Sequence, residues 1–376
     1  MVLSVVLAGG LPAAVSAQEN RPSERAVPSP ADSAAVRGGP YFFRDLPYGS
    51  EAYYGPFAVL LNKGFALSLM EGTTRKLRDF PYGVDGVVDA LIRPAAAIER
   101  GGGWGKFVRE ELLPLSWSQD HVKWWTNYTG HMIEGGVHWR QLQEWYAARG
   151  VPLSGLMSGI TTMSAAFLNE SYESHGTEVG AAATVADLYV FDLAGIALFS
   201  SESVSRFFAR TLHANLWTGQ ASVVVPSGET DNNSSHLFLK LPWSPVHRSS
   251  IFVWTGIGAG VGLTFHRGDG VDWSVGAGPD AAGRTVNPVT GEERATLTWG
   301  GGVWVDRDGS LLASAQVSQV PHRLLRVNVY PGVLGGVGRE LGIWLIVSHD
   351  FEVRFGLSSR HTLGVGLGVG AEENAR

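Results

Sequence analysis

Between Ser250 and Gly370, apolar residues alternate with small ones, and this pattern constrains the fold more than any other feature. In His361–Gly370, leucine and valine alternate with glycine at every second position. Successive side chains of a β-strand point to opposite faces, so this period predicts strands with one apolar face and one small face. Glycine is normally depleted in strands, and the chain contains 49 glycines, which makes the pattern unusual.

Eight runs of this kind lie between Ser250 and Gly370, and the runs at 220–225 and 236–241 raise the number to ten. Turn sequences such as Arg267-Gly268-Asp269-Gly270 separate them. We predict an antiparallel β-barrel of eight to ten strands over residues 217–370. A lipocalin-like barrel or a sandwich is the soluble alternative, but its outer face would carry charged residues. Here the second face carries glycine and threonine, which favours an outer-membrane barrel with its apolar face toward lipid.

The two faces of the predicted strands have different expected roles. Four residues of the last strand are expected to face lipid: Leu363, Val365, Leu367 and Val369. Six tryptophans are candidates for the membrane interface: Trp243, Trp254, Trp273, Trp299, Trp304 and Trp344. The glycine face leaves space inside the barrel, which water, a ligand or the helical part of the chain would fill. We therefore expect the helices to contact the barrel.

Before the strands, residues 46–216 follow a helical pattern, so the fold class is α+β with an N-terminal helical domain. One helix is expected to turn an apolar stripe toward the core, formed by Leu156, Ile160, Met163 and Phe167. The step from Thr184 to Asp187 resembles a capping box that opens another helix. Charges interrupt the apolar segments, which favours helices outside the hydrocarbon layer.

Residues 1–17 resemble a signal peptide, with an apolar run and small residues before the expected cleavage after Ala17, although the usual basic start is missing. Residues 18–45 are interpreted as a disordered linker. The absence of cysteine excludes disulfides, thiolate metal sites and cysteine nucleophiles. The net charge of −6 gives no support for a nucleic-acid partner.

Ionisable residues in an apolar setting concentrate between positions 127 and 173. Two helices joined by a short loop at Gly150-Val151-Pro152 are expected to pack antiparallel, which brings the end of the second helix near the start of the first. The first contributes a polar stripe and the second a pair of carboxylates one turn apart. The candidate polar cluster consists of Asn127, His131, Glu134, His138, Glu170 and Glu173.

Three interpretations of this cluster compete. Di-iron sites on bundle helices need a repeated Glu-x-x-His, whereas Glu134 and His138 are four positions apart without a repeat. A hydrolase would use His131 as base and Ser154, Ser158 or Ser164 as nucleophile, but none lies in a Gly-x-Ser-x-Gly sequence. The favoured interpretation is a buried polar network that fixes helix register, so no metal, cofactor or catalytic residue is assigned.

The segment Asn127-Tyr128-Thr129-Gly130-His131 resembles the start of a domain of unknown function found in exported bacterial proteins. The resemblance extends to about Phe199, and the corresponding positions are His131, Arg140 or Arg149, Glu170, Glu173, and Thr184 with Asp187. It implies a location in the bacterial envelope and no established activity.

Together these observations predict a non-enzymatic outer-membrane protein, structural or channel-like, whose partner is the lipid of that membrane. The alternative is an envelope hydrolase that modifies lipid or cell wall through His131 and Glu170.

Overall fold

The computed structural model describes residues 39–67, 80–114, 125–173, 181–225, 227–243, 248–286, 293–362 and 364–370. The predicted signal peptide and most of the predicted linker lie outside these residues. The chain divides into the units Met1–Gly39 and Pro40–Arg376, and the following description concerns the second unit.

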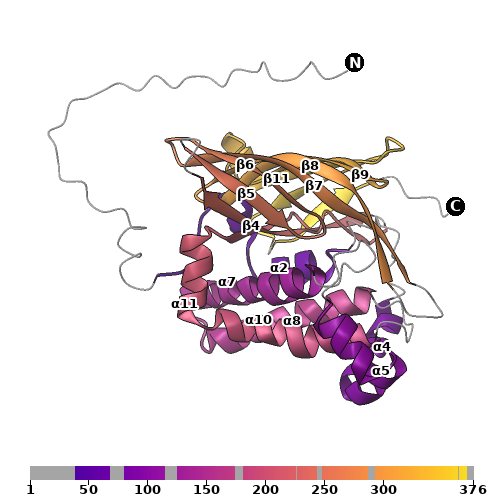
Figure 1. Cartoon of the computed structure of the whole chain (residues 1–376). Coiled ribbons are helices and arrows are strands. Elements are labelled where there is room, and N and C mark those ends of the chain that lie inside the picture. Colours follow the sequence, from indigo (N-terminus) through magenta and orange to yellow (C-terminus); the bar gives the residue numbers. More distant parts are fainter. Residues whose placement is uncertain are drawn as a thin grey trace, which may run out of the picture. The chain divides into compact units, whose positions relative to one another are not determined.

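Helices come first in the described chain and strands follow from Asn215, which gives the α+β order predicted from the sequence (Figure 1). The helical elements before the strands are η1 (Gly49–Tyr53), α2 (Pro56–Gly64), α4 (Phe80–Ile92), α5 (Pro94–Arg100), α6 (Trp104–Lys106), η3 (Phe107–Leu112), η4 (Trp125–Glu134), α7 (Gly135–Ala148), α8 (Ser154–Glu173), α9 (Ala181–Ala186), η5 (Asp187–Phe191), α10 (Asp192–Phe199), α11 (Glu202–Arg206) and η6 (Phe207–Thr211). The elements η3, η4, η5 and η6 are π-helical, and η1 is a 3₁₀ helix. A further 3₁₀ helix, η7 (Gly336–Glu340), lies among the strands.

The predicted hairpin between α7 and α8 turns at Gly150, whose φ of 67° lies in the left-handed region that glycine tolerates. The N–H groups of Gly150 and Val151 donate to the carbonyls of Ala147 and Tyr146, both at 3.0 Å, so the last carbonyls of α7 are satisfied. The helix break predicted at this position is therefore confirmed.

The orientation predicted for α8 holds for Met163 and Phe167, which pack against a buried cluster, and is wrong for Leu156 and Ile160. Leu156 and Ile160 are 59% and 53% exposed instead of buried. Small and hydroxyl-bearing residues form the buried face: Ser158, Thr161, Thr162, Ala165 and Ala166. Small side chains allow α2 and α7 to approach α8 closely, and two of the hydroxyls donate to backbone carbonyls, Ser158 to Trp139 and Thr161 to Met157. The first half of the apolar stripe therefore lies on the outside.

The strands form one sheet in which all pairs but one are antiparallel. They are β1 (Asn215–Thr218), β2 (Ser222–Val225), β3 (Thr230–Asp231), β4 (Ser235–Pro242), β5 (Ser249–Thr255), β6 (Ala259–His266), β7 (Val271–Val286), β8 (Glu293–Arg307), β9 (Ser310–Val320), β10 (Arg323–Val329), β11 (Leu341–Val347), β12 (Val353–Ser359) and β13 (Gly366–Val369). The strand order is β1-β4-β5-β6-β7-β8-β9-β10-β11-β12-β13-β2-β3.

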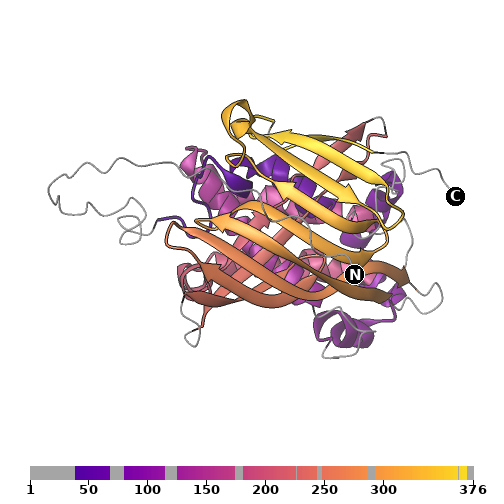
Figure 2. The same cartoon turned by 90° about the horizontal axis from the view of Figure 1, so that it is seen from above.

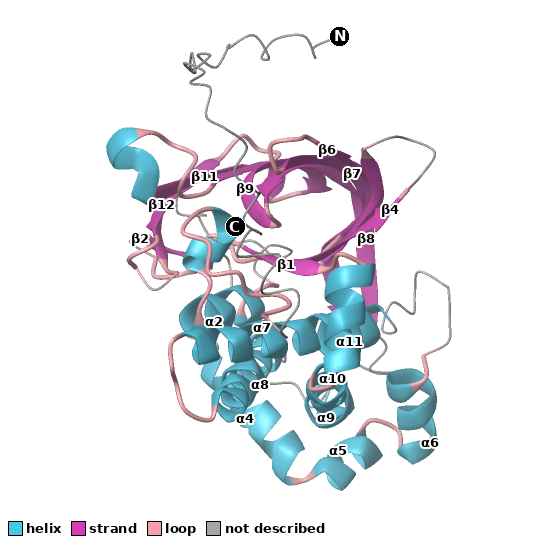
Figure 3. Cartoon of the chain, turned by 90° about the vertical axis from the view of Figure 1, so that its left-hand side faces the viewer, coloured by secondary structure: helices cyan, strands magenta, loops and turns pink. Residues whose placement is uncertain are grey.

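The prediction of a barrel with eight to ten strands is wrong in two respects. The sheet has 13 strands, and its hydrogen-bonded order does not close into a barrel. β1 pairs with β4 at one end of the strand order, and β2 pairs with β13 near the other end. These two strands follow one another in the chain, but they are not hydrogen-bonded neighbours in the sheet. Gly219 lies between them and donates from its N–H to the Ser234 carbonyl at 2.7 Å. The sheet is strongly curved (Figure 3).

One face of the sheet, here called the outer face, is apolar, and it is open except where helices cover Leu216 of β1 and Leu237 of β4. A row of directly paired residues crosses it from β4 to β2, and no member of the row is buried. In order, the paired residues are Leu241, Ile251, Leu263, Val275, Val303, Ala315, Val327, Leu345, Phe355, Val369 and Val225. The alternation predicted from the sequence therefore holds, with the apolar residues facing out.

The opposite, inner face is small, polar and buried. The neighbouring row of paired residues contains only small or polar residues, two tryptophans and one valine, and every member is buried. These residues are Ser250, Thr264, Ser274, Trp304, Ser314, Asn328, Trp344, Gly356, Gly368 and Val224. Along these two rows the apolar residues therefore lie on the outer face and most polar residues on the inner face, whereas a sheet in water usually exposes its polar face.

Tryptophan rings occupy the space that glycines leave on the inner face. Trp254 lies opposite Gly260 in the ladder between β5 and β6, and a Cβ on Gly260 or Gly276 would collide with its ring. Trp344 covers Gly356 and Gly368 in the same way. Trp254, Trp304 and Trp344 therefore point inward and are buried, whereas Trp243, Trp273 and Trp299 are exposed. Six interfacial tryptophans were expected, so this interpretation is wrong for the three buried ones.

The helices contact the sheet, as was expected, and pack along one side of it (Figures 1 and 2). Val137 of α7 and Phe199 of α10 share a buried cluster with Leu216 of β1 and Leu237 of β4. In addition, the backbone N–H of Ser234 donates to the side-chain oxygen of Asn62 at 2.9 Å. The helical and strand parts of the chain therefore share a core.

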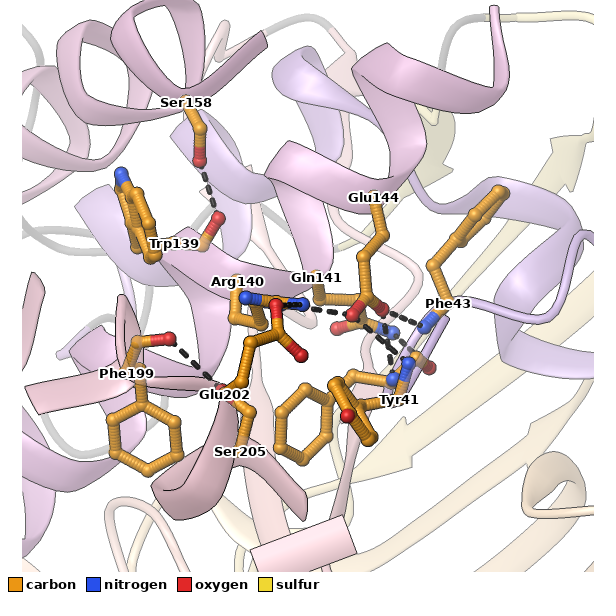
Figure 4. Close-up of polar contacts among 11 residues, drawn as sticks. Tyr41, Phe43, Trp139, Arg140, Gln141, Glu144, Ser158, Phe199, Glu202 and Ser205 are labelled. Carbon is orange, nitrogen blue, oxygen red and sulfur yellow. Dashed lines mark hydrogen bonds and ion pairs between the residues drawn. The ribbon is translucent and has the colours of Figure 1, made fainter. Parts of the chain in front are cut away.

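Residues 41–43 were assigned to the linker, but Tyr41, Phe42 and Phe43 are buried. Their backbone N–H groups donate to the carboxylate of Glu144 on α7, at 2.9, 2.8 and 3.0 Å (Figure 4). Arg140 donates to the same carboxylate at 3.0 Å. The aromatic side chains and this carboxylate attach the segment to the helices, so the folded unit begins before residue 46.

Candidate functional site

Three ionisable side chains from three helical elements meet in the helical part of the chain. Nε2 of His131, on η4, lies 3.9 Å from Oε1 of Glu170, on α8, and 3.9 Å from Oδ2 of Asp187, on η5. One ligand-type atom from each residue lies within 4.8 Å of the other two. Glu170 and Asp187 are buried, and the His131 side chain is 13% exposed. We call these three residues the His–Glu–Asp cluster.

A fourth residue orients the histidine. Nδ1 of His131 lies 3.2 Å from Oδ2 of Asp192 on α10, and the other oxygen of Asp192 lies 3.4 Å from Nζ of Lys63 on α2. Asp192 is fully buried at its side chain and accepts from both groups. Because Asp192 is bound to Nδ1, the Nε2 atom of His131 is directed toward Glu170 and Asp187.

The two oxygens of Glu170 have different environments. Oε2 accepts a hydrogen bond of 2.9 Å from the hydroxyl of Thr184. Oε1 is buried and has no hydrogen-bond partner among the described residues, and the same is true of Oδ1 of Asp187. The Thr184 side chain therefore holds Glu170 instead of capping a helix, so the predicted capping box with Asp187 is wrong. The helix has already begun at Ala181.

Close helix contact brings these residues together. A Cβ on Gly195 of α10 would collide with the Met132 carbonyl and the Gly136 backbone, so only glycine permits this approach. The contact places Asp192, about one turn earlier, beside His131. Both His131 and Asp187 lie in π-helical segments, which widen the helical turn and occur frequently at functional sites.

The electrostatics of the cluster follow from burial and from the close carboxylates. Burial disfavours the charged form of His131, but the carboxylates of Asp187, Asp192 and Glu170 outweigh it and raise the pKa of His131 to about 10. Burial raises the pKa of Asp187 to about 7 and that of Glu170 well above its usual range. Burial would also raise the pKa of Asp192, but Lys63 and His131 lower it.

The structure divides the predicted polar cluster. His131 and Glu170 meet, which is the antiparallel arrangement expected for the hairpin. Asn127 instead donates to the Glu111 carbonyl at 3.0 Å. His138 faces the sheet, where its Nε2 lies 2.7 Å from the Ser235 hydroxyl and 3.8 Å from Glu134, and burial lowers its pKa. Glu173 adds negative charge near Glu170 and Asp187.

Sequence reasoning missed three members of the site. Asp187 was noted in a capping step, in the family resemblance and as a charge that interrupts an apolar segment. Asp192 was noted only as such a charge, and Lys63 was not considered. A charged residue inside an otherwise apolar helix was the available signal for both aspartates, because such a charge needs a buried partner. No local pattern indicates Lys63, which lies far earlier in the chain.

The geometry gives a serine hydrolase no support within the described chain. The ion pairs and hydrogen bonds of the His131 ring all involve carboxylates. Ser158, one of the candidate nucleophiles, donates to the Trp139 carbonyl on the neighbouring helix (Figure 4). Its hydroxyl is thereby used in helix packing.

Comparisons with protein-family models, with curated proteins and with solved structures found no match to this chain.

Proposed function

We propose that this protein is a bacterial outer-membrane protein with a structural role, whose curved sheet contacts lipid acyl chains through its outer face. The observation that carries the proposal is the row of paired apolar residues from Leu241 to Val225, none of which is buried. Monomeric soluble proteins rarely expose apolar patches larger than a few hundred Å². Strands in outer membranes place apolar residues toward lipid and polar residues inside.

The charges of the sheet support the same orientation. Nζ of Lys240 lies 2.8 Å from Asp272 and 2.6 Å from Asp306 on the inner face. Arg323 pairs with Asp280 at 2.7 Å on this face as well. A sheet with its outer face in water would place such groups outside, where hydration is available. Their inward position keeps these charges away from the outer face, where lipid would disfavour them.

The packing of the inner face favours a structural role over an open channel. Aromatic rings from both the helical part and the sheet form one buried cluster there. Its members are Tyr53, Trp217, Phe238, Phe252, Trp254, Trp304, Leu311 and Tyr330. Side chains that fill the interior in this way leave no wide aqueous path between them.

One helical segment, Ala181–Phe199, is long and apolar enough to cross a membrane by length and composition. Core helices of soluble proteins meet the same criterion, and this segment carries Asp187 and Asp192, which face His131. The proposal therefore assigns lipid contact to the sheet. The resemblance at Asn127–His131 to exported bacterial proteins is consistent with an envelope location.

Lipid contact is testable with single cysteines, because the natural chain has none. An environment-sensitive dye on Leu345→Cys, at the centre of the outer face, should be quenched by brominated lipids in vesicles. The matched control is Asp350→Cys in the exposed turn between β11 and β12, where aqueous iodide should quench instead. Quenching of both dyes by iodide and of neither by lipid would reject the proposal. If lipid quenches neither dye and the protein dimerises as its concentration rises, a second copy of the chain covers the outer face instead of lipid.

A further inference from the structure

We propose that His131, Glu170 and Asp187 bind one divalent transition-metal ion, such as Zn²⁺ or Mn²⁺. The sequence analysis assigned no metal, and the proposal does not depend on the membrane role. It concerns the helical part of the chain and adds a binding site to it.

The three side chains offer a suitable donor set. One imidazole nitrogen and two carboxylate oxygens are the mixed ligands that Zn²⁺ and Mn²⁺ accept. Ligand atoms about 2.0–2.2 Å from a metal lie roughly 3.3 Å apart in a tetrahedral site. The distances from His131 Nε2 to Glu170 and Asp187 are both 3.9 Å, so small rotations of the side chains would bring the ligands to an ion.

An unpartnered buried oxygen points independently to a ligand. Glu170 is only 3% exposed, and its Oε1 has no hydrogen-bond partner among the described residues. A buried acceptor that is left unsatisfied destabilises the folded state, so such groups normally have a partner. The same oxygen is the Glu170 atom nearest to His131, so an ion between the three residues would satisfy it.

A network held together by direct hydrogen bonds explains this geometry less well. Separations of 3.9 Å exceed the usual hydrogen-bond range, so His131 bonds directly to neither Glu170 nor Asp187. Direct bonds occur instead around the three residues, from Asp192 to His131 and from Thr184 to Glu170. His131 and Glu170 are therefore hydrogen-bonded to their neighbours, whereas His131 forms no direct hydrogen bond with Glu170 or Asp187.

These surrounding bonds are the kind that orient metal ligands. A ligating histidine usually bonds its other ring nitrogen to a carboxylate, which fixes the ring and leaves the ligating nitrogen free. Asp192 does this for His131 at 3.2 Å, and Lys63 holds Asp192 at 3.4 Å. Asp192 is therefore a positioning residue. The negative charge of Glu173 near both ligand carboxylates further favours a cation.

The test uses the full chain, purified with chelator and then exchanged into chelator-free buffer. Zn²⁺ or Mn²⁺ is added at increasing concentration, and bound metal is measured by elemental analysis after gel filtration. We expect one ion per chain and a metal-dependent rise in melting temperature. Co²⁺ should give visible absorption bands that report its coordination to nitrogen and oxygen.

Glu170→Gln retains the side-chain shape and an oxygen that accepts from Thr184, so this variant should fold while losing at least tenfold in metal affinity. Asp187→Asn should have a similar effect, and Asp192→Asn should weaken binding by about 10–100-fold through the histidine. The matched control is Glu134→Gln, which alters a buried carboxylate beside His138 and outside the proposed metal site. The metal affinity of this control variant should lie within twofold of the wild-type affinity.

Less than one ion in ten wild-type chains at saturating Zn²⁺, Mn²⁺ and Co²⁺ would overturn the proposal, whatever the variants do. Equal affinity in the wild-type protein and in folded Glu170→Gln would also overturn it. If Glu170→Gln does not fold, circular dichroism will reveal this, and the wild-type stoichiometry together with Asp187→Asn decides the outcome.

Discussion

Nδ1 of His131 lies 3.2 Å from an oxygen of Asp192, which is 61 positions further along the chain. The same aspartate also contacts Lys63, so one buried carboxylate interacts with the side chains of both His131 and Lys63, which lie on two other helical elements. His131 lies 3.9 Å from Glu170 and from Asp187, so its shorter contact with Asp192 joins η4 to α10, and Lys63 adds α2. Removal of the Asp192 carboxylate should therefore affect the folded state more than removal of an exposed aspartate.

We expect Asp192→Asn to lower the free energy of unfolding by about 3 kcal/mol, because it leaves Lys63 and His131 buried without their carboxylate. Urea unfolding followed by circular dichroism measures this change. Asp89→Asn is the control, since Asp89 is 39% exposed where it pairs with Arg100, and it should cost less than about 1 kcal/mol. Equal losses in the two variants would contradict the role given to Asp192.

Glu144 holds the first residues of the folded unit by accepting from three backbone N–H groups (Figure 4). Glu144→Gln removes the charge and one acceptor oxygen, so we expect a loss of roughly 2–4 kcal/mol of unfolding free energy. Residues 41–43 should also become sensitive to proteolysis. The control is Glu99→Gln, which changes an exposed carboxylate in α5 and should leave this segment protected. Unchanged protection in Glu144→Gln would show that aromatic packing alone retains the segment.

Gly260 lies opposite Trp254 and under its ring, so Gly260→Ala should force the ring to move. Overpacking of this kind costs about 1–3 kcal/mol and should alter the near-ultraviolet circular dichroism of tryptophan. Gly283, on the neighbouring strand β7, has open space where a Cβ would lie, so Gly283→Ala is the control with little expected effect. A normal tryptophan signal in Gly260→Ala would refute this packing.

The buried carboxyl group of Glu51 should make the stability of the folded protein depend on pH. Burial raises its pKa from 4.5 to about 7, although Oε2 accepts from the Arg44 and Leu46 N–H groups. Between these pH values the folded state retains a proton that the unfolded state releases, so stability falls as pH rises. The contribution is complete below about pH 4.5 and is lost above about pH 7, at a cost of roughly 3 kcal/mol.

Substituting Glu51 tests this dependence. Glu51→Gln should remove this part of the slope when melting temperature or unfolding free energy is measured from pH 4 to 8. Exposed Glu99→Gln should keep the wild-type slope. The assignment to Glu51 would be wrong if its substitution left the wild-type profile unchanged.

The sequence alone predicted which strand residues share a face, because a strand alternates its side chains wherever it lies. Leu367 and Val369 lie on the exposed outer face, while Gly366 and Gly368 are buried on the inner face. Leu363 falls outside the described residues. The helical hairpin that joins His131 to Glu170 was also predictable, since the turn at Gly150 and the helix lengths are local properties.

Tertiary structure decided what local rules leave open. The alternation of β13 does not reveal that β2, from the start of the strand region, pairs with it in parallel, or that the sheet stays open. Apolar periodicity in α8 indicated a stripe, but whether that stripe faces the core depends on which neighbours approach the small residues of its other side. Asp187 and Asp192 meet His131, and Lys63 meets Asp192, only because helices from separate parts of the chain pack closely, as α7 and α10 do at Gly136 and Gly195. Such contacts depend on the packing of whole helices, which the spacing of residues along one helix does not specify.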